Sequence, residues 1–546
     1  MNTADLLLQC LKAHGVNTMY GVPGEENADV VMALSHQKDI QFITCRHEQT
    51  GAFMAEMHGR LTGIPGICLA TLGPGATNLT TGVAQANFDV APLIAIIGQG
   101  STHRLHKMSH QNIDAIAMFK PITKWVVSIL SPEVLPEIVA KAFKIATMGS
   151  PGAVVIELPE DIAALPADGL KPLCFQTHTY EETPSLEFIQ RFLELFSRSK
   201  KPLVLLGEGA VRTECDAVLA TFLEKTGCYA AYTFMGKGCI GFQYPRSLHC
   251  VGLGLKDLAI EAFEQADLVI CIGYNMIEWS PSQWNIGVQK HIIHIHSCPA
   301  EIDVAYPADL EMIGYIPSIL SNVQQVFPPE MQKKDPYFHA IQQRVEKDIR
   351  GDSDDLHFPM KPKTILRMLR DTLGKEDILV SDVGAHKMWV ARQYGAYYSK
   401  TCFISNGFCS MGGSIPGAVE AKRLNPQKNV VALCGDGGFV MSIQALFTAV
   451  SLQVPIVVLL WNDDAYGLIA WKQNMHFHAH AFTDLNNPDL AEVAKKIGCH
   501  ARKIASAEHF VEDLRWALSH QDKPTVLEVP VDYSENMKLF HHLEAK

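Results

Sequence analysis

Two acidic segments in the last third of the sequence have residue types and spacing suited to a metal–phosphate site. The first, residues 434–438 (Cys-Gly-Asp-Gly-Gly), follows a strand pattern and precedes a helix pattern. Glycines at such a turn let backbone N–H groups approach a phosphate, and the helix dipole adds its positive end. Asp436 would repel a bare phosphate unless a divalent cation lay between them. The segment therefore indicates a metal diphosphate.

A second carboxylate follows at a distance that fits the same site. Asp463 stands 27 positions after Asp436, after one helix pattern and one strand pattern. The carboxyl ends of parallel strands meet at one edge of a sheet, so both carboxylates can lie together there. They suit octahedral Mg²⁺, which takes hard oxygens from protein, phosphate and water. Alone, Asp436 could be an ordinary helix cap, but the pair favours the metal.

Two strand-to-helix junctions near the amino end carry further polar residues. Residues 45–49 (Cys-Arg-His-Glu-Gln) place Glu48 at the start of a helix-like stretch. Residues 71–78, from Thr71 to Asn78, have the glycine-rich composition of a ligand loop. Considered separately, Glu48 is typical of an acidic residue that favours a helix start.

The elements that must position these residues alternate regularly along the chain. Short apolar, β-rich runs are separated by helix patterns, which predicts parallel sheets covered on both faces. We therefore expect an α/β protein with three doubly wound parallel-sheet domains. Polar, turn-rich breaks at residues 177–184 and 327–355 divide it into domains 1–178, 185–345 and 356–535. This division agrees with about 150 residues per domain.

Composition excludes several classes of protein. The 46 basic and 58 acidic residues give a net charge of −12, so we expect no nucleic-acid or membrane partner. Apolar runs of eight residues are far shorter than the ~20 that span a bilayer. The amino end lacks a basic leader, which favours a cytoplasmic protein. The fourteen cysteines are scattered, often within apolar runs, and we expect small core residues.

Together these motifs resemble the thiamine-diphosphate enzymes of the acetohydroxyacid synthase/pyruvate oxidase group. The resemblance spans nearly the whole chain and is carried by residues 20–24, 46–49, 72–78, 381–389 and 435–463. It implies an aminopyrimidine-binding domain, a central domain and a diphosphate-binding domain, in that order. It also implies thiamine diphosphate and Mg²⁺ as cofactors.

The resemblance assigns roles to individual residues. Glu48 matches the glutamate that protonates the aminopyrimidine ring, Met411 matches the apolar wedge that bends the cofactor, and Gln111 lies near the reacting carbons. The implied metal ligands are Asp436, Asp463 and the backbone carbonyl of Ala465. The implied cofactor-binding residues, besides these, are Pro23, Gly24, Thr71, Gly75, Asn78, His386, Gly435, Gly437, Gly438, Tyr466 and Gly467.

Within the group, the chain looks most like the catabolic acetolactate synthases. These enzymes decarboxylate pyruvate and condense the hydroxyethyl carbanion with a second pyruvate to give 2-acetolactate. Biosynthetic relatives have tryptophan where this chain has Lys472, which favours pyruvate as the acceptor. Catabolic relatives also dispense with FAD, so we expect none here.

Two other functions stay open at this point. A 2-oxo acid decarboxylase would release an aldehyde, but its relatives often carry a His-His pair, and the only such pair here, His541-His542, lies in the tail. A cofactor-free scaffold would be expected to lack Glu48 or Asp436, and both are present. The resemblance further implies that these two residues serve one cofactor from different subunits, in at least a homodimer and commonly a homotetramer.

Overall fold

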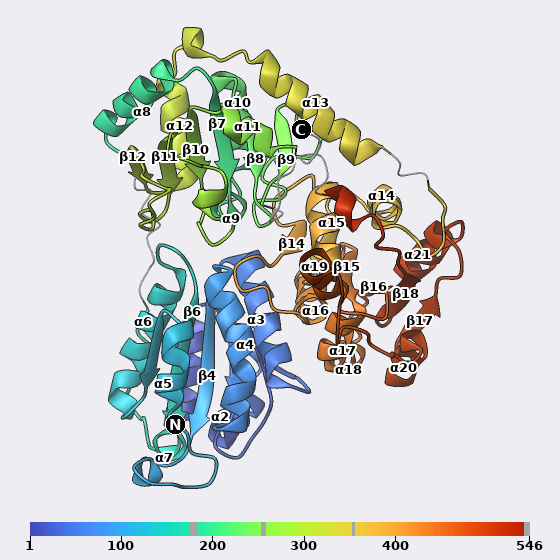
Figure 1. Cartoon of the computed structure of the whole chain (residues 1–546). Coiled ribbons are helices and arrows are strands. Elements are labelled where there is room, and N and C mark those ends of the chain that lie inside the picture. The colour runs from blue at the N-terminus through green and yellow to red at the C-terminus, as the bar shows by residue number, and fades with distance from the viewer. Residues whose placement is uncertain (175–183, 253–257, 352–354, 540–546) are drawn as a thin grey trace.

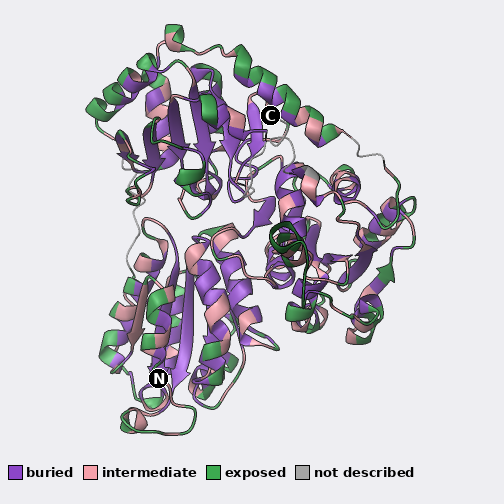
Figure 2. Cartoon of the chain, viewed as in Figure 1, coloured by how far each residue is buried: buried purple, intermediate pink, exposed green. Residues whose placement is uncertain are grey.

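The computed structural model describes residues 1–174, 184–252, 258–351 and 355–539. It contains three six-stranded sheets, and every strand pairing within them is parallel. Helices cover both faces of each sheet (Figure 1), and the sheets form the buried centre of each unit (Figure 2). The predicted α/β class with three doubly wound domains is therefore confirmed.

The first sheet has the strand order β2-β1-β3-β4-β6-β5. Its strands are β1 (Thr18–Gly21), β2 (Gln41–Thr44), β3 (Gly66–Ala70), β4 (Leu93–Gln99), β5 (Trp125–Ser128) and β6 (Ala153–Pro159). Its helices are α1 (Thr3–Ala13), α2 (Ala28–Ser35), α3 (Glu48–Thr62), α4 (Pro74–Phe88), α5 (Ala115–Phe119), α6 (Leu135–Thr147) and α7 (Glu160–Ala164). The central strands are buried on both faces, as their unbroken apolar runs require.

The second sheet has the order β12-β11-β10-β7-β8-β9. The chain adds β8 and β9 on one side of β7 and then β10, β11 and β12 on the other, so the order of strands reverses between β7 and β10. Its strands are β7 (Pro202–Leu206), β8 (Tyr229–Tyr232), β9 (Ser247–Cys250), β10 (Leu268–Ile272), β11 (His291–His296) and β12 (Leu310–Ile313). Its helices are α8 (Leu186–Arg198), α9 (Glu208–Arg212), α10 (Asp216–Thr226), α11 (Ile260–Gln265), α12 (Ile316–Val326) and α13 (Pro336–Arg350).

The third sheet has the order β14-β13-β15-β16-β18-β17, which repeats the topology of the first. Its strands are β13 (Ile378–Ser381), β14 (Cys402–Ile404), β15 (Val430–Gly435), β16 (Val457–Asn462), β17 (His500–Lys503) and β18 (Thr525–Pro530). Its helices are α14 (Pro362–Thr372), α15 (Ala385–Gln393), α16 (Ser414–Leu424), α17 (Asp436–Ser442), α18 (Gln444–Ser451), α19 (Gly467–Phe477), α20 (Leu490–Ile497) and α21 (Phe510–Ser519).

The predicted domain limits stay predictions. Residue 178 and most of the first polar break lie outside the described residues, as do His541 and His542. Residue 345, the predicted end of the central domain, lies within α13, which runs from the central unit toward the third (Figure 1).

Among the described helices, none combines the length and the apolar character that a membrane crossing requires.

The first and third units share one continuous hydrophobic core. Helix α3 packs against α16 (Figure 1), and Met57 and Ala418 belong to the same buried cluster. Asp89, at the end of α4, is fully buried at this contact. Its Oδ1 accepts hydrogen bonds from the backbone N–H groups of Gly407 (2.8 Å) and Phe408 (3.2 Å). This carboxylate fixes the start of a loop of the third unit, residues 405–413, to the first.

We expect Asp89→Ala to destabilise the protein by about 2–3 kcal/mol, because it removes the acceptor of two backbone N–H groups at a buried contact. Urea unfolding followed by tryptophan fluorescence measures the effect. Asp39→Ala is the matched control, since Asp39 pairs with Lys12 on the surface and should change stability by less than about 1 kcal/mol. Equal unfolding midpoints for the two variants would contradict this role of Asp89.

Candidate active site

A cavity of about 270 Å³ opens at the carboxyl edge of the third sheet. Strands β13, β15 and β16 end there almost level, because Ser381 pairs with Leu433 and Gly435 pairs with Trp461. The lining includes every residue of the third unit that the sequence assigns to the cofactor or metal: His386, Met411, Gly435, Asp436, Gly437, Gly438, Asp463, Ala465, Tyr466 and Gly467. The structure therefore brings these residues together at one site.

Two carboxylates stand at the floor of this cavity. Burial raises the pKa of Asp436 to about 6 and that of Asp463 to about 7, and for Asp463 the charge of Asp436 adds to the increase. Asp436 Oδ1 accepts from its neighbour Gly437 N (2.9 Å), and Oδ2 accepts from Asn487 Nδ2 (2.8 Å). A divalent cation would favour the charged form of both carboxylates. With the Ala465 carbonyl in the lining, the donor set consists of hard oxygens that suit Mg²⁺.

The turn after β15 packs closely against neighbouring side chains, so only glycines fit there. A Cβ on Gly437 would lie 2.7 Å from Tyr466 Cε1, and a Cβ on Gly438 would lie 2.2 Å from Asp382 Oδ2. These glycines lie in the first turn of α17, where backbone N–H groups have no carbonyl partner in the helix, although the Gly437 N–H is bonded to the Asp436 side chain. The turn thus has the backbone that a diphosphate needs for close approach.

All three units hold the loop that carries Met411. Besides the Asp89 contacts from the first unit, Gln85 Oε1 accepts from Ser410 N (3.2 Å). From the central unit, the Glu278 carbonyl accepts from Asn406 Nδ2 (2.7 Å). Within the third unit, both carboxylate oxygens of Asp382 accept from Gly412 N (2.9 Å each). The residues immediately before and after Met411 are therefore both held by hydrogen bonds.

Glu48 lies in the first unit, in a second group of predicted residues. It begins α3, whose N-cap is His47, and it is 8% exposed. Asn78, on α4, donates from Nδ2 to Glu48 Oε2 (2.9 Å). A Cβ on Gly75 would lie 3.4 Å from Glu48 Oε1, so the glycine leaves the carboxylate room. The sequence-predicted partners Glu48, Gly75 and Asn78 are therefore neighbours.

Thr71 and Gly24 complete this group. Thr71 ends the turn after β3 and donates to Glu26 Oε2 (2.9 Å). A Cβ on Gly24 would lie 2.5 Å from Thr71 Cβ, so the two loops touch. Pro23 precedes Gly24 and is exposed. These residues lie at the carboxyl edge of the first sheet. In the third sheet, which has the same strand order, the cavity opens at the corresponding edge.

One chain does not bring the two groups to a common cavity. The walls of the cavity beside Met411 come from residues 383–533, and Glu48 is not among them. Gln111 is not among them either. It has a positive φ of 56°, is exposed, and its carbonyl oxygen would lie 2.5 Å from a Cβ on Gly73. A single site containing Glu48, Gln111 and Asp436 would therefore need a second chain.

Cys409, Asn487 and Tyr533 are among the residues of the site that sequence reasoning missed. Cys409 and Tyr533 line the cavity, and Asn487 bonds to Asp436. Burial, followed by the charges of Asp463 and Asp436, raises the pKa of Tyr533 well above its ordinary value. The order of elements offered a signal for Tyr533, because it follows a strand that pairs with β16 and must end at the same edge. No local pattern pointed to Asn487.

Comparisons with known proteins agree along the whole chain. Three family models match: the thiamine pyrophosphate enzyme N-terminal TPP binding domain at residues 1–118, the central domain at 189–323 and the C-terminal TPP binding domain at 382–529.

Relatives with assigned names match over nearly their full length. The chain is 33% identical to acetolactate synthase of Bacillus subtilis (strain 168), over 98% of this chain and 94% of that protein. It is 32% identical to the catabolic acetolactate synthase of Raoultella terrigena, over 99% and 97%. It is 31% identical to acetolactate synthase isozyme 2 large subunit of Escherichia coli (strain K12), over 98% and 97%. The chain therefore belongs to the thiamine pyrophosphate enzyme family, and among its members it is similar to acetolactate synthases.

Proposed function

We propose that this protein is an acetolactate synthase that uses thiamine diphosphate and Mg²⁺ to join two pyruvate molecules with loss of one CO₂. The observation that carries the proposal is the full-length similarity to acetolactate synthases, one of them catabolic, in a chain that keeps the cavity residues and Glu48. The decarboxylase alternative is not favoured by these relatives.

Each group of residues has a defined task in this proposal. Asp436, Asp463 and the Ala465 carbonyl would hold the metal, and the glycine turn 435–438 would receive the diphosphate. Met411 would pack against the cofactor and keep it bent. Glu48, which is kept in place by Asn78, would hold a proton at the aminopyrimidine ring. When bound, thiamine diphosphate supplies a nucleophilic carbon and an electron sink for decarboxylation.

We further propose that the site is completed by a partner subunit in at least a homodimer. Helix α19 contributes residues to the cavity wall but has no buried residue of its own. Ile469, Met475 and Phe477 on it are 49%, 43% and 70% exposed. Exposed apolar side chains on a helix without buried residues, beside a site that lacks Glu48, are typical of a surface covered by another chain. A homotetramer and a cytoplasmic location stay predictions.

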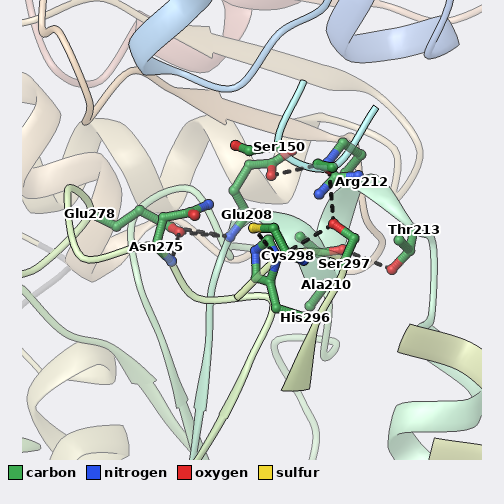
Figure 3. A network of polar contacts seen from close by, with 12 residues as sticks. Ser150, Glu208, Ala210, Arg212, Thr213, Asn275, Glu278, His296, Ser297 and Cys298 are labelled. Atoms are coloured by element: carbon green, nitrogen blue, oxygen red, sulfur yellow. Dashed lines mark hydrogen bonds and ion pairs between the residues drawn. The ribbon is translucent and has the colours of Figure 1, made fainter. Parts of the chain in front are cut away.

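FAD does not fit the central unit. The reversal between β7 and β10 is where a doubly wound sheet binds a nucleotide. Here the carboxylate of Glu278 occupies that edge (Figure 3). It accepts hydrogen bonds from Glu208 N (3.1 Å to each oxygen), Asn275 N (3.0 Å) and Thr233 Oγ1 (2.5 Å). These three donors are already bonded to Glu278, and its buried carboxylate lies where a phosphate would bind. This supports the proposal that the protein carries no FAD.

We also propose that pyruvate is the acceptor. Lys472 lies exposed on α19, where biosynthetic relatives are expected to have tryptophan. The neighbouring Trp471 cannot replace that tryptophan in this conformation, because its indole N–H points to Met537 Sδ (3.0 Å). A site without that large ring favours the smaller acceptor.

The direct test incubates purified protein with pyruvate, Mg²⁺ and thiamine diphosphate and resolves the products by NMR. We expect 2-acetolactate and CO₂ in equal amounts. Acetaldehyde as the main product would overturn the proposal in favour of a decarboxylase. Unchanged pyruvate, with cofactor present, would indicate a non-catalytic protein.

Asp436→Asn should weaken Mg²⁺-dependent binding of thiamine diphosphate by about 100-fold or more, because loss of even an outer-shell partner of a metal costs 10–100-fold. A titration of cofactor at fixed Mg²⁺, followed by tryptophan fluorescence, gives the affinity. Glu492→Gln is the matched control, as it removes an exposed carboxylate of the third unit that pairs with Lys495 on the surface and does not line the cavity. Similar affinities for the two variants would show that Asp436 does not bind the metal.

A further inference from the structure

Cys409 lines the cavity and contacts the buried side chain of Lys387. Lys387 Nζ lies 3.2 Å from Cys409 Sγ, 3.1 Å from the carbonyl oxygen of Ser405 and 2.9 Å from Asn406 Oδ1. Lys387 is only 6% exposed, so its head group is held by these contacts rather than by solvent. An ammonium has three N–H donors, and the three acceptors use them all. Of these acceptors, the sulfur is the one that can be oxidised.

The surroundings of Cys409 differ from those of most cysteines in the chain. Eleven of the fourteen are buried, as expected for small core residues, whereas Cys409 is half-buried and faces the cavity. An oxidant that enters the cavity can therefore reach its sulfur. Exposure of a thiol beside a cationic group is the setting in which cysteine oxidation is selective.

The backbone at Cys409 is also unusual. Its φ is 62°, in the left-handed region where glycine is unstrained and a residue with a Cβ is not. Strain of this kind costs about 1 kcal/mol or more and persists where the surrounding structure holds the residue in place. The Asp89, Gln85 and Glu278 contacts described above supply that support. The loop thus presents the thiol to Lys387 at a fixed distance.

We propose that Cys409 and Lys387 are an oxidisable pair that peroxide converts into a covalent N–O–S bridge across the cavity wall. In the first step the thiol attacks hydrogen peroxide, an S–O bond forms, the O–O bond breaks, and sulfenic acid and one water result. Lys387 then releases a proton to water and becomes the neutral amine. In the second step one N–H bond of Nζ and the O–H bond of the sulfenic acid break, and an N–O bond forms. A second hydrogen peroxide, whose O–O bond breaks, takes up the two electrons and two protons and gives two waters.

The bridge would change the shape of the cavity. Lys387 follows His386 on α15, and Cys409 lies two residues before Met411, and both of these neighbours line the cavity. A covalent tie between α15 and the loop 405–413 would restrict movement of the two walls between which the cofactor is proposed to bind. Excess thiol would reduce the bridge and restore both side chains. This consequence rests on the proposed function, whereas the bridge itself does not.

The test treats the full-length protein with hydrogen peroxide and digests it for peptide mass spectrometry. The expected product is a cross-linked pair of peptides containing Lys387 and Cys409, heavier than their sum by one oxygen and lighter by two hydrogens. Dithiothreitol should abolish it. Lys387→Arg keeps the positive charge but lacks the amine, and it should give Cys409 sulfinic acid without a cross-link. Cys174→Ser, which removes an exposed cysteine far along the sequence, should leave the bridge intact.

Cofactor binding gives a second readout. In the parent protein, oxidation should weaken binding of thiamine diphosphate with Mg²⁺ by about tenfold or more, with recovery after reduction. Each variant is compared with its own untreated sample. Cys409 recovered as sulfinic or sulfonic acid without a cross-link in the parent, or unmodified while Cys174 is oxidised, would overturn the proposal. If the reduced protein binds no thiamine diphosphate, the proposed function fails, and the mass result still decides on the bridge.

Discussion

Two carboxylates held close together in a largely buried cavity are the constraint on which the site depends. Asp436 and Asp463 follow neighbouring parallel strands, and burial raises the pKa of both. Without a cation, the pair would have to give up charge or accept strong repulsion. A magnesium ion would remove this conflict and add a positive centre for a diphosphate. The glycine turn, the Ala465 carbonyl and the start of α19 would then surround a common ligand.

The same sheet topology is used twice around this site and a different one beside it. The first and third sheets share one strand order, and each gathers its polar loops at the carboxyl edge. The central sheet has the order in which nucleotides are usually bound, but Glu278 fills its edge with a carboxylate of the chain. Because the carbonyl of Glu278 also accepts from Asn406, the central unit helps to position the Met411 loop. The central unit therefore supports the Met411 loop structurally.

The fold and most of the third-unit site could be predicted from the sequence for one reason. Strands that are apolar on both faces and separated by helices form parallel sheets, and their ends must meet at one edge. This geometry predicted that Asp436 and Asp463 lie at one edge of the sheet, and both line the cavity there. Tyr466, Glu48 and Asn78 were implied by the family resemblance, and Asn78 does bond to Glu48.

What could not be predicted depends on contacts between units. The clamp on residues 405–413 by Asp89, Gln85 and Glu278 joins residues far apart in sequence, and no local pattern encodes it. The cysteines as a group were expected to be small core residues, whereas Cys409 has a left-handed backbone conformation and lines the cavity. Gln111 was predicted near the reacting carbons, and whether a partner chain brings it there is a question of assembly.

The central claim is that Glu48 of one subunit and Asp436 of another serve the same cofactor, and complementation between variants tests it most directly. Glu48→Gln and Asp436→Asn should each be nearly inactive alone. Randomly mixed subunits would form hybrids in half of all dimers, and one of the two sites in each hybrid would be intact. We expect the mixture to recover about a quarter of parental acetolactate formation. No recovery, with hybrid dimers demonstrated by native mass spectrometry, would contradict it.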